Sequence, residues 1–485
     1  MHDSVGQKLQ VLSPGQCEQI HLASLEILDH TGVRFLEPAA LRQLAAAGAI
    51  VDERAVARLP RSLVEWALRV TPSRILLHDR QGQPALRLEP RNVYFGTGSD
   101  CHHLIDPRTG ERRRFTKRDV EDGVRLCDAL PNIDFVLSIG LVSDAPTGSS
   151  DVHQFDAMIR NTAKPIVFTT HDLDNCRTII EMAGVVAGGL ERLRAAPSLV
   201  HFAEVDCPLK FAADTCQKIT YTAEQGIPVL QGAGPMMGAS GPQTQAGALA
   251  LANAECLAGN VLVQLACPGT PFIRGIGVHP FDMRAGTLPY GAPELSLINA
   301  AAADLARFYR VPTWGYAGCS DAKTVDQQAA MEATASIVMS LLGGANLVHD
   351  VGYIESGMTS SFEMIVLSDT IIEMGRAMLK EIEVSPETLA LDVVHRVGQD
   401  GSYLEEDHTL AHYREVWYSE ARMVDRDRFA TWLGAGRPTM GDRLNGRVRE
   451  ILETHRPLPV PDGAGGGLAD LVAEADRRAV ASTSG

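Results

Sequence analysis

The sequence lacks the features that mark secreted and membrane proteins. Its N-terminus, MHDSVGQKLQ, has no positively charged start followed by an apolar run, so we expect no secretory signal. No stretch approaches the ~18 consecutive apolar residues that indicate a membrane span. The nine cysteines are scattered, odd in number and without a CxxC pair, which is typical of reduced thiols. We therefore expect a cytoplasmic protein that does not contact a membrane.

An excess of positive charge is also lacking. The formal net charge is −16, which argues against nucleic acid or an anionic membrane surface as the main partner. The chain of 485 residues is 45% hydrophobic and 21% charged, which is an ordinary globular composition with enough length for a large core.

The motifs of several enzyme classes are missing as well. Two adjacent pairs, His102-His103 and His349-Asp350, do not have metal-ligand spacing, because neighbouring side chains in a strand point to opposite faces. No GxGxxG leads into a helix, and there is no P-loop and no GxSxG turn. We therefore predict no metal site, and the motifs assign no catalytic residue.

A regular alternation of strand-like and helix-like segments is present. Helical patterns follow the apolar runs, for example at 117–130, 211–225, 243–266, 295–309 and 327–342. Eight such units predict an α/β protein with a (β/α)8 TIM barrel, and a doubly wound open sheet is the alternative. The eight runs that we interpret as buried parallel strands are 93–98, 135–142, 165–170, 198–204, 227–232, 271–277, 312–318 and 345–352.

The segments outside the alternation predict three further parts. Residues 1–90 are expected to form an N-terminal helical layer, and residues 91–385 the barrel. The charged, aromatic-containing stretch 386–460 is expected to form a C-terminal helical cap. Residues 461–485 begin with a glycine-rich run and are expected to form a flexible linker and tail.

The loops that follow the strands are long and polar, and in a barrel they surround the active site. The segments 232–242 and 277–294 stand out among them. The end of the barrel that these loops surround is here called the mouth. Aromatic groups beside carboxylates at the mouth favour a cationic ligand, through cation–π contact. Taken singly, Phe95 and Trp314 are better interpreted as barrel core, whereas several such residues at one mouth together favour a binding pocket. The candidate substrate-binding residues are Phe95, Asp100, Glu204, Gln231, Arg274, Trp314, Tyr316, Asp321, His349, Tyr353 and Glu355.

Over roughly residues 10–455 the sequence resembles the trimethylamine methyltransferase family of corrinoid-dependent enzymes, which includes glycine betaine methyltransferases. The resemblance is specific because several stretches carry it together. They are FGTGSDCHHLIDPRTGERR, DALPNIDFV, GALALANAECLAGNVLVQL, TVDQQAAMEA, LLGGANLVHDVGYIESGMTSSFEMIVLSD and DHTLAHYREVWY.

This resemblance implies a (β/α)8 barrel that moves a methyl group from an amine to the cobalt of a separate corrinoid carrier protein, as in methanogenesis-type methyl transfer. The trimethylamine-specific members carry pyrrolysine in the barrel, and the inferred register places that position at about Thr334. The chain contains no such residue and is therefore similar to the pyrrolysine-lacking branch, whose substrates are quaternary amines such as betaines. A homo-oligomer is also implied.

The cobalamin is expected on the partner and not tightly bound to this chain. Asp151-Val152-His153 has the DxH spacing of corrinoid carriers, but Asp156 stands where their glycine belongs. A quaternary amine needs no proton donor, because its leaving group is a neutral tertiary amine. We expect Arg274 or His349 to bind a betaine carboxylate.

Two alternative functions remain open from the residues. One is a (β/α)8 lyase or hydrolase that uses His349, Asp321 and Glu204 as acid and base groups. The other is a non-catalytic betaine-binding protein that retains the barrel.

Overall fold

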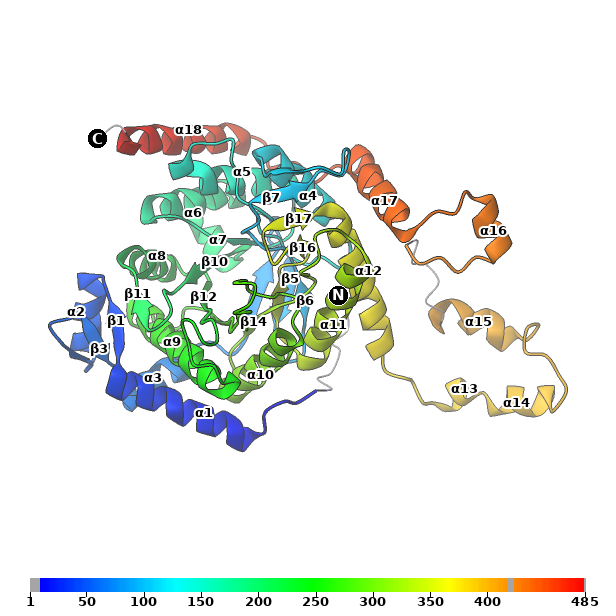
Figure 1. Ribbon diagram of the computed structural model, residues 1–485, viewed down its shortest axis with the longest axis horizontal. Helices are drawn as coiled ribbons and strands as arrows, with labels where there is room; N and C mark the ends of the chain where they lie inside the picture. Colours follow the sequence, from blue (N-terminus) through cyan, green and yellow to red (C-terminus); the bar gives the residue numbers. More distant parts are fainter. Residues whose placement is uncertain (1–8, 417–422, 484–485) are drawn as a thin grey trace.

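A parallel sheet of seven strands lies at the centre of the protein, and helices surround it (Figure 1). The computed structural model describes residues 9–416 and 423–483. The strand order is β6-β15-β14-β13-β12-β10-β9, and each strand coincides with one of the predicted runs. The strands are β6 (Tyr94–Phe95), β9 (Ile166–Phe168), β10 (Leu199–Glu204), β12 (Val229–Ala233), β13 (Phe272–Ile276), β14 (Thr313–Tyr316) and β15 (Leu347–His349).

Eight helices form a ring around this sheet. Each helix contacts the next in chain order, and α12 contacts α4, so that the ring returns to its start. Their inward faces are apolar and pack on the outer face of the sheet, as expected for βα units. The helices are α4 (Lys117–Ala129), α5 (Ser150–Asn161), α6 (Leu173–Ala187), α8 (Ala213–Glu224), α9 (Gln245–Ala266), α10 (Pro293–Tyr309), α11 (Gln327–Gly343) and α12 (Phe362–Leu379); the short α7 (Leu190–Ala195) follows α6.

The predicted run 135–142 does not form a regular strand. Phe135 makes a single parallel bridge to Gly96, and Val136 makes one to Ile166. Ile139 has a φ of 69°, a conformation that interrupts an extended strand, and its N–H donates to the carbonyl of Gly98 at 2.7 Å. The prediction of a regular eighth strand is therefore wrong, although the segment lies between the two edge strands.

The N-terminal layer contains the expected helices and, in addition, short strands that the sequence does not predict. β1 and β3 pair with β11 and β2 in a separate four-stranded sheet. These short strands alternate buried and exposed residues, a pattern too brief to predict beside the helices. The elements are α1 (Pro14–Glu26), the π-helix Ile27–Thr31, β1 (Val33–Phe35), α2 (Pro38–Ala46), β2 (Ile50–Val51), β3 (Val56–Arg58), α3 (Arg61–Val70) and β11 (Lys210–Phe211).

The hairpin of β4 (Ile75–His78) and β5 (Pro84–Leu88) covers the amino ends of the sheet strands. The N–H of His78 donates to Pro197 and that of Arg80 to Ala163, and both acceptors stand just before a sheet strand. The apolar side of the hairpin packs against the side chains inside the sheet, including Phe202 and Trp314. This end of the sheet is therefore plugged.

A second small sheet lies at the opposite end, where the strands point. Its order is β16-β17-β7-β8, and β17 pairs with β7 in parallel. The sheet joins the loop after β6 to the loop after β15 and so closes one side of this end. Its strands are β7 (His103–Ile105), β8 (Arg112–Arg114), β16 (Tyr353–Ile354) and β17 (Thr359–Ser361).

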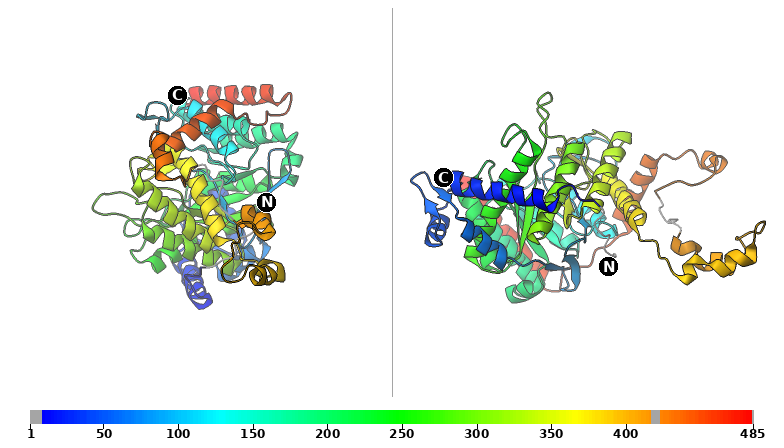
Figure 2. Two further views of the ribbon diagram at one scale, coloured as in Figure 1. Left: turned by 90° about the vertical axis from the view of Figure 1, so that its right-hand side faces the viewer. Right: turned by 90° about the horizontal axis from the view of Figure 1, so that it is seen from below.

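Residues 380–416 and 423–439, here called the arm, extend sideways from the barrel helices (Figures 1 and 2). Within the described part of the arm only Val393 is buried. The described residues of the expected cap up to 439 therefore do not cover the sheet, and residues 417–422 of it lie outside the described residues. The arm helices are α13 (Pro386–Leu389), α14 (Leu391–Val397), α15 (Asp407–Val416) and α16 (Phe429–Gly434).

After the arm the chain returns to the barrel. α17 (Met440–Thr454) packs on α12 and α4, and α18 (Ala464–Thr483) packs on α5 and α6. The expected flexible tail is thus mostly a docked helix. Leu468, Ala475 and Ala479 recur at helical spacing and are buried, which gives this glycine-rich start an apolar face that orders it.

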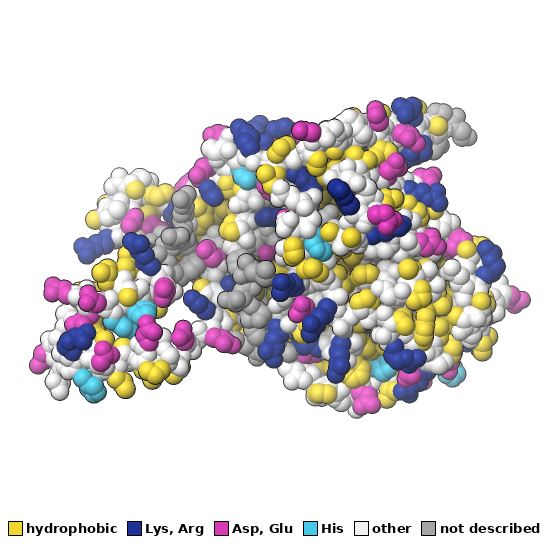
Figure 3. Space-filling view, turned by 180° about the vertical axis from the view of Figure 1, so that it is seen from behind, with side chains coloured by type: hydrophobic (Ala, Val, Ile, Leu, Met, Phe, Trp, Pro, Cys, Tyr) yellow, Lys and Arg dark blue, Asp and Glu magenta, His cyan; other side chains and the backbone are white. Residues whose placement is uncertain are grey.

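The burial of the most apolar helix and the charge of one surface bear on the class of protein. Among the described helices, α9 is long and apolar enough to cross a membrane, but 89% of its most apolar window is buried inside the protein, as in the core helix of a soluble protein. The face seen from behind in Figure 3 has Lys and Arg interspersed with Asp and Glu, so it presents no continuous basic surface.

Candidate active site at the carboxyl ends of the strands

A cavity of about 550 Å³ opens at the end of the sheet where the strands point. Its walls come from the strand ends of β10, β14 and β15 and from the loops after β6, β10, β12 and β13. This is the end at which barrel enzymes hold their substrates. The lining residues are Asp100, Phe202, Glu204, Val205, Asp206, Cys207, Lys210, Gly234, Met236, Ser240, His279, Leu288, Tyr290, Tyr316 and His349.

One wall of the cavity is aromatic. The ring of His349 lies 4.4 Å from that of Tyr316, and His279 lies 5.1 Å from Tyr316 and 5.3 Å from Tyr290, measured between centroids. Trp314 does not line the cavity itself. Its ring lies 4.1 Å from that of His349, tilted by 35°, and packs in the core inside the sheet. Aromatic faces attract cations through their quadrupole, so this wall suits a cationic ligand.

Two carboxylates face the cavity from other sides. Asp100 and Glu204 are exposed, but to the cavity and not to the outer surface. Enclosure by protein raises the pKa of Asp100 and, together with the Asp100 carboxylate, raises the pKa of Glu204 to about 7. Among the described ion pairs none involves either side chain. The cavity is therefore acidic and lacks a built-in counter-ion at these two groups.

A third carboxyl group, that of Asp350, lies behind His349. It is 1% exposed, and neither of its oxygens has a hydrogen-bond partner. Burial and the nearby carboxylates of Asp100 and Glu204 raise the pKa of Asp350 well above its usual range. Its surroundings therefore favour the neutral form of the Asp350 carboxyl.

His349 is neutral for a related reason. Its Nδ1 lies 2.8 Å from the carbonyl oxygen of Gly315, which can only accept, so Nδ1 carries the hydrogen. Burial lowers the pKa of His349 to about 3. Its Nε2 lone pair lies 3.3 Å from Oδ1 of Asp350. His349 is thus unsuited to bind an anion as a cation, although the sequence suggested it for a carboxylate.

The predicted site residues divide into those that line the cavity and those that do not. Asp100, Glu204, Tyr316 and His349 line it directly. Tyr353 is one step removed, because its hydroxyl accepts the Asp100 N–H at 2.6 Å.

Asp321 supports the cavity from outside. Its carboxylate accepts the N–H groups of Tyr290 at 2.8 Å and Gly291 at 3.1 Å and the Ser356 hydroxyl at 2.9 Å. It therefore positions the loop that places Tyr290 in the wall. The predicted acid and base groups Asp321, Glu204 and His349 do not converge on one point.

Three predicted residues face the helices and not the cavity. Phe95 packs in the core between sheet and helices. Nε2 of Gln231 donates to Gly232, and its Oε1 points at α9, where Gly259 leaves room for it. Arg274 lies over the ring of Tyr309 at 4.3 Å and donates to Asn253. The expectation that Arg274 binds substrate is thus contradicted by its direction.

Two more expectations fall outside the cavity. Glu355 accepts from Nε of Arg112 at 2.9 Å in a surface ion pair. Thr334 is exposed on α11, and its hydroxyl donates to Ala330 at 2.7 Å. A residue that lines the barrel cannot occupy that position, so the inferred register is wrong.

The DxH segment is engaged in structural contacts. Nε2 of His153 lies 2.9 Å from Asp476, and its Nδ1 lies 3.3 Å from Lys117. Asp151 accepts from Asn175 at 2.8 Å. Among the described residues no group of three or more His, Cys, Asp or Glu is arranged to hold a metal.

Several lining residues escaped prediction. His279 and Tyr290 lie in the 277–294 loop. The sequence predicts that this loop lies at the mouth but does not indicate which of its residues line the cavity. Asp206 and Lys210 lie in the turn after β10. The sequence could have identified them, because they are charged residues directly after a strand that ends in Glu204. Asp350 was placed on the opposite face from His349 by strand alternation.

The sequence matches the family model described as trimethylamine methyltransferase over residues 3–480. The chain belongs to the trimethylamine methyltransferase family. Trimethylamine methyltransferase MttB of Desulfitobacterium hafniense (strain DSM 10664 / DCB-2) is 34% identical over 458 residues, covering 94% of this chain and 92% of that protein. The glycine betaine methyltransferase of Desulfitobacterium hafniense (strain Y51) is 31% identical over 456 residues, covering 93% and 94%.

Among solved structures, the monomethylamine methyltransferase MtmB of Methanosarcina barkeri aligns at 13% identity with a TM-score of 0.46, covering 94% of this chain and 96% of that one. Membership of the trimethylamine methyltransferase family makes this chain a methyltransferase. Its activity is that of a corrinoid-dependent family.

Proposed function

We propose that this protein moves a methyl group from a quaternary or otherwise methylated amine, such as a betaine, to the Co(I) corrinoid of a separate carrier protein. The observation that carries the proposal is the cavity itself. Its aromatic wall and the unpaired carboxylates of Asp100 and Glu204 suit a small organic cation. Relatives of similar length are named for trimethylamine and for glycine betaine.

The sheet is proposed to work as a closed (β/α)8 barrel in which 135–142 serves as the eighth strand. Two facts support this. The bridges of Phe135 and Val136 connect both edge strands, and the eight surrounding helices form an uninterrupted ring. The residues of 135–142 then separate β6 from β9 without joining a full hydrogen-bond ladder.

The residues present fit a corrinoid that approaches from outside. The cavity of about 550 Å³ has room for a methylated amine and for a group that reaches it from the mouth, where the cavity opens toward solvent. His153 is held by Asp476 and Lys117 and is not available as a cobalt ligand. When its carrier docks, the corrinoid supplies the nucleophile that accepts the methyl group. We also infer a cytoplasmic homo-oligomer.

The proposed reaction requires this chain to bind and orient its substrate but not to transfer a proton. The bond between nitrogen and the methyl carbon breaks, and the nitrogen keeps the electron pair, so a quaternary ammonium leaves as a neutral tertiary amine and no proton is transferred. The aromatic wall and the carboxylates orient the cation with one methyl toward the mouth and exclude water. Because the positive charge leaves the nitrogen, soft aromatic contacts cost less in the transition state than a tight ion pair.

Incubation with cob(I)alamin and a set of methylated amines tests the proposal. Methylcobalamin should form with at least one quaternary amine, as followed by its visible spectrum. Demethylation without any corrinoid would indicate a different reaction class. Binding of amines without methyl transfer, seen by thermal shift, would indicate a binding protein.

A further inference from the structure

Among the residues that line the cavity, Lys210 is the single lysine or arginine. It stands at the start of β11, just beyond the strand that ends in Glu204. Its ammonium lies 3.1 Å from the carboxylate of Asp206, and the two side chains are 44% and 55% exposed, respectively. An exposed pair of this kind contributes about 0–1 kcal/mol, so a ligand can compete for Lys210 at little cost.

The position of Lys210 is held firmly by its backbone. Asp206 and Lys210 exchange two backbone hydrogen bonds, of 2.9 and 3.2 Å, which close the turn between them. The N–H of Leu209 donates to the fully buried Glu255 at 2.6 Å, and β11 pairs with β1 of the N-terminal layer. The ammonium therefore extends from a rigid platform and not from a loose loop.

The charges of the cavity come from different elements. Glu204 ends β10 and Asp100 follows β6, whereas Lys210 begins β11 and its side chain is 44% exposed. A simple cation needs only the carboxylates of Asp100 and Glu204. A molecule that carries a permanent cation and a carboxylate a few bonds apart matches both these carboxylates and Lys210.

We propose that Lys210 is the residue that recognises the carboxylate of a betaine substrate, and that it thereby selects zwitterions over simple quaternary cations. This inference rests on the proposed function. Lys210 takes the role that the sequence suggested for Arg274, whose side chain points to the helices. Asp206 holds the ammonium when no substrate is bound.

The test compares Lys210→Met with the wild type on glycine betaine and on tetramethylammonium, which has no carboxylate. The KM for glycine betaine should rise at least about 10-fold while kcat changes less than about 3-fold, because uniform binding is lost and not the chemical step. The KM for tetramethylammonium should stay the same or fall. Lys210→Arg should recover most of the affinity for glycine betaine, which a merely structural role would not require.

Lys380→Met is the matched control, because Lys380 is an exposed lysine at the end of α12, outside the cavity. An unchanged KM for glycine betaine in Lys210→Met overturns the inference. So does a wild type that uses tetramethylammonium as well as glycine betaine, although methyl transfer then still supports the proposed function. Absence of transfer from every quaternary amine would instead overturn the proposed function.

Discussion

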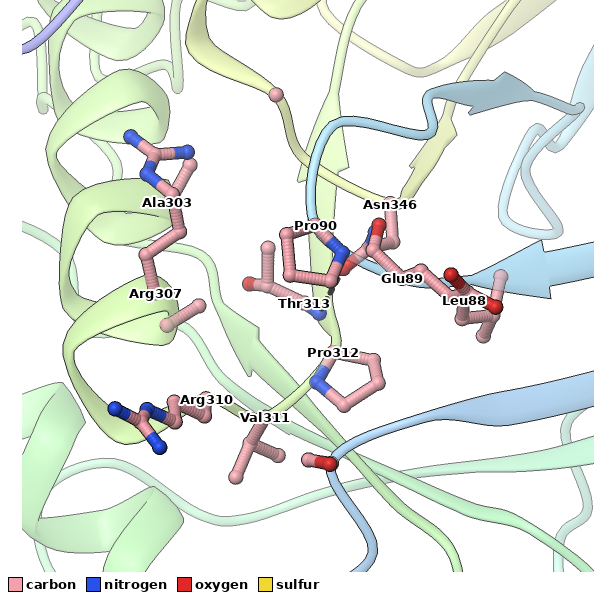
Figure 4. A pocket seen from close by; sticks show the side chains of 13 residues that line it. Leu88, Glu89, Pro90, Ala303, Arg307, Arg310, Val311, Pro312, Thr313 and Asn346 are labelled. Carbon is pink, nitrogen blue, oxygen red and sulfur yellow. Dashed lines mark hydrogen bonds between the residues drawn. The ribbon is translucent and has the colours of Figure 1, made fainter. Parts of the chain in front are cut away.

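The two ends of the central sheet are built differently. At the carboxyl end lies the cavity of about 550 Å³ with its acidic and aromatic walls. At the amino end a hollow of only about 20 Å³ lies between the β4–β5 hairpin and the end of α10 (Figure 4). In that figure the pocket is lined by Glu89 and Pro90 on one side and by Arg307 and Arg310 on the other.

Polar groups at the two ends are satisfied to different degrees. Asn346, at the amino end, donates to Glu89 at 2.7 Å and to Asn92 at 3.1 Å and accepts from Thr313 at 3.0 Å. At the other end, Nε2 of His279 and both oxygens of Asp350 are buried without partners. Such groups cost stability. Nδ1 of His78, in the hairpin at the amino end, is also buried without a partner, so the carboxyl end is set apart for a ligand by its cavity together with these groups and not by these groups alone.

The largest expected effect on activity comes from Glu204→Gln at the mouth. Removing this charge should lower kcat/KM for a quaternary amine about 30- to 100-fold at pH 8, since a carboxylate near a cation contributes roughly 2–3 kcal/mol at an intermediate dielectric. The melting temperature should not fall, because the pKa of Glu204 is raised to about 7 by enclosure and its charge opposes folding.

Glu355→Gln provides the control for that variant. Glu355 is also a carboxylate near the mouth, but it pairs with Arg112 on the surface. Its loss should change kcat/KM less than about 2-fold, as for other surface pairs. Equal losses in both variants would remove the distinction between the cavity and its surroundings.

The second-largest effect is expected at the amino end of the sheet and concerns the free energy of unfolding. Asn346→Ala should lower the free energy of unfolding by about 2 kcal/mol, because it leaves buried partners without hydrogen bonds. Activity per folded molecule should not change. Urea denaturation and steady-state kinetics measure the two quantities. Asn92→Ala is the control, because Asn92 is less buried and meets Asn346 through its backbone carbonyl, which the variant retains. A loss of activity without a loss of stability would reverse the roles of the two ends.

A smaller effect is expected of pH on the KM for a quaternary amine. Enclosure raises the pKa of Glu204 to about 7, so its carboxyl is mostly neutral below that pH and attracts a permanent cation mainly above it. The KM for a quaternary amine should therefore fall about 5- to 10-fold from pH 6 to pH 8. In Glu204→Gln this dependence should flatten. A KM that rises with pH in the wild type would contradict the assignment.

The smallest effect is expected for Arg274→Met. Nε and Nη1 of Arg274 are buried without partners, and its guanidinium faces Tyr309 away from the cavity. The KM for glycine betaine should stay within about 3-fold, and stability should be equal or higher by about 1 kcal/mol, as when other buried charges are replaced by apolar groups. A 10-fold rise in KM would bring Arg274 back to the substrate.

Strand positions were predictable from the sequence, but side-chain directions were not. Strands buried on both faces carry apolar residues on both, so the pattern does not tell which side chains point inward. Glu204 and Tyr316 were assigned to the mouth on the same grounds as Gln231 and Arg274, and only the first two line it. The mouth as a region was thus predictable, and its members were predictable only in part.

Local backbone geometry explains two further misses. Asp350 has a φ of 72°, which breaks the alternation of a strand and brings its carboxyl beside His349. Ile139 has a φ of 69° and interrupts the expected eighth strand. Positive φ at a non-glycine residue leaves no mark in a hydrophobic pattern, so neither feature could be predicted from it.

The plugged amino end has a consequence for the order of events. Because the β4–β5 hairpin packs into the sheet interior, the mouth is the way in for a substrate and the way out for the product. A carrier protein that presents its cobalt there covers the same opening. We therefore expect compulsory-order kinetics: the amine enters first, the carrier follows, and the demethylated amine escapes after the carrier departs. Excess carrier should then inhibit at low amine concentration, and more amine should relieve the inhibition.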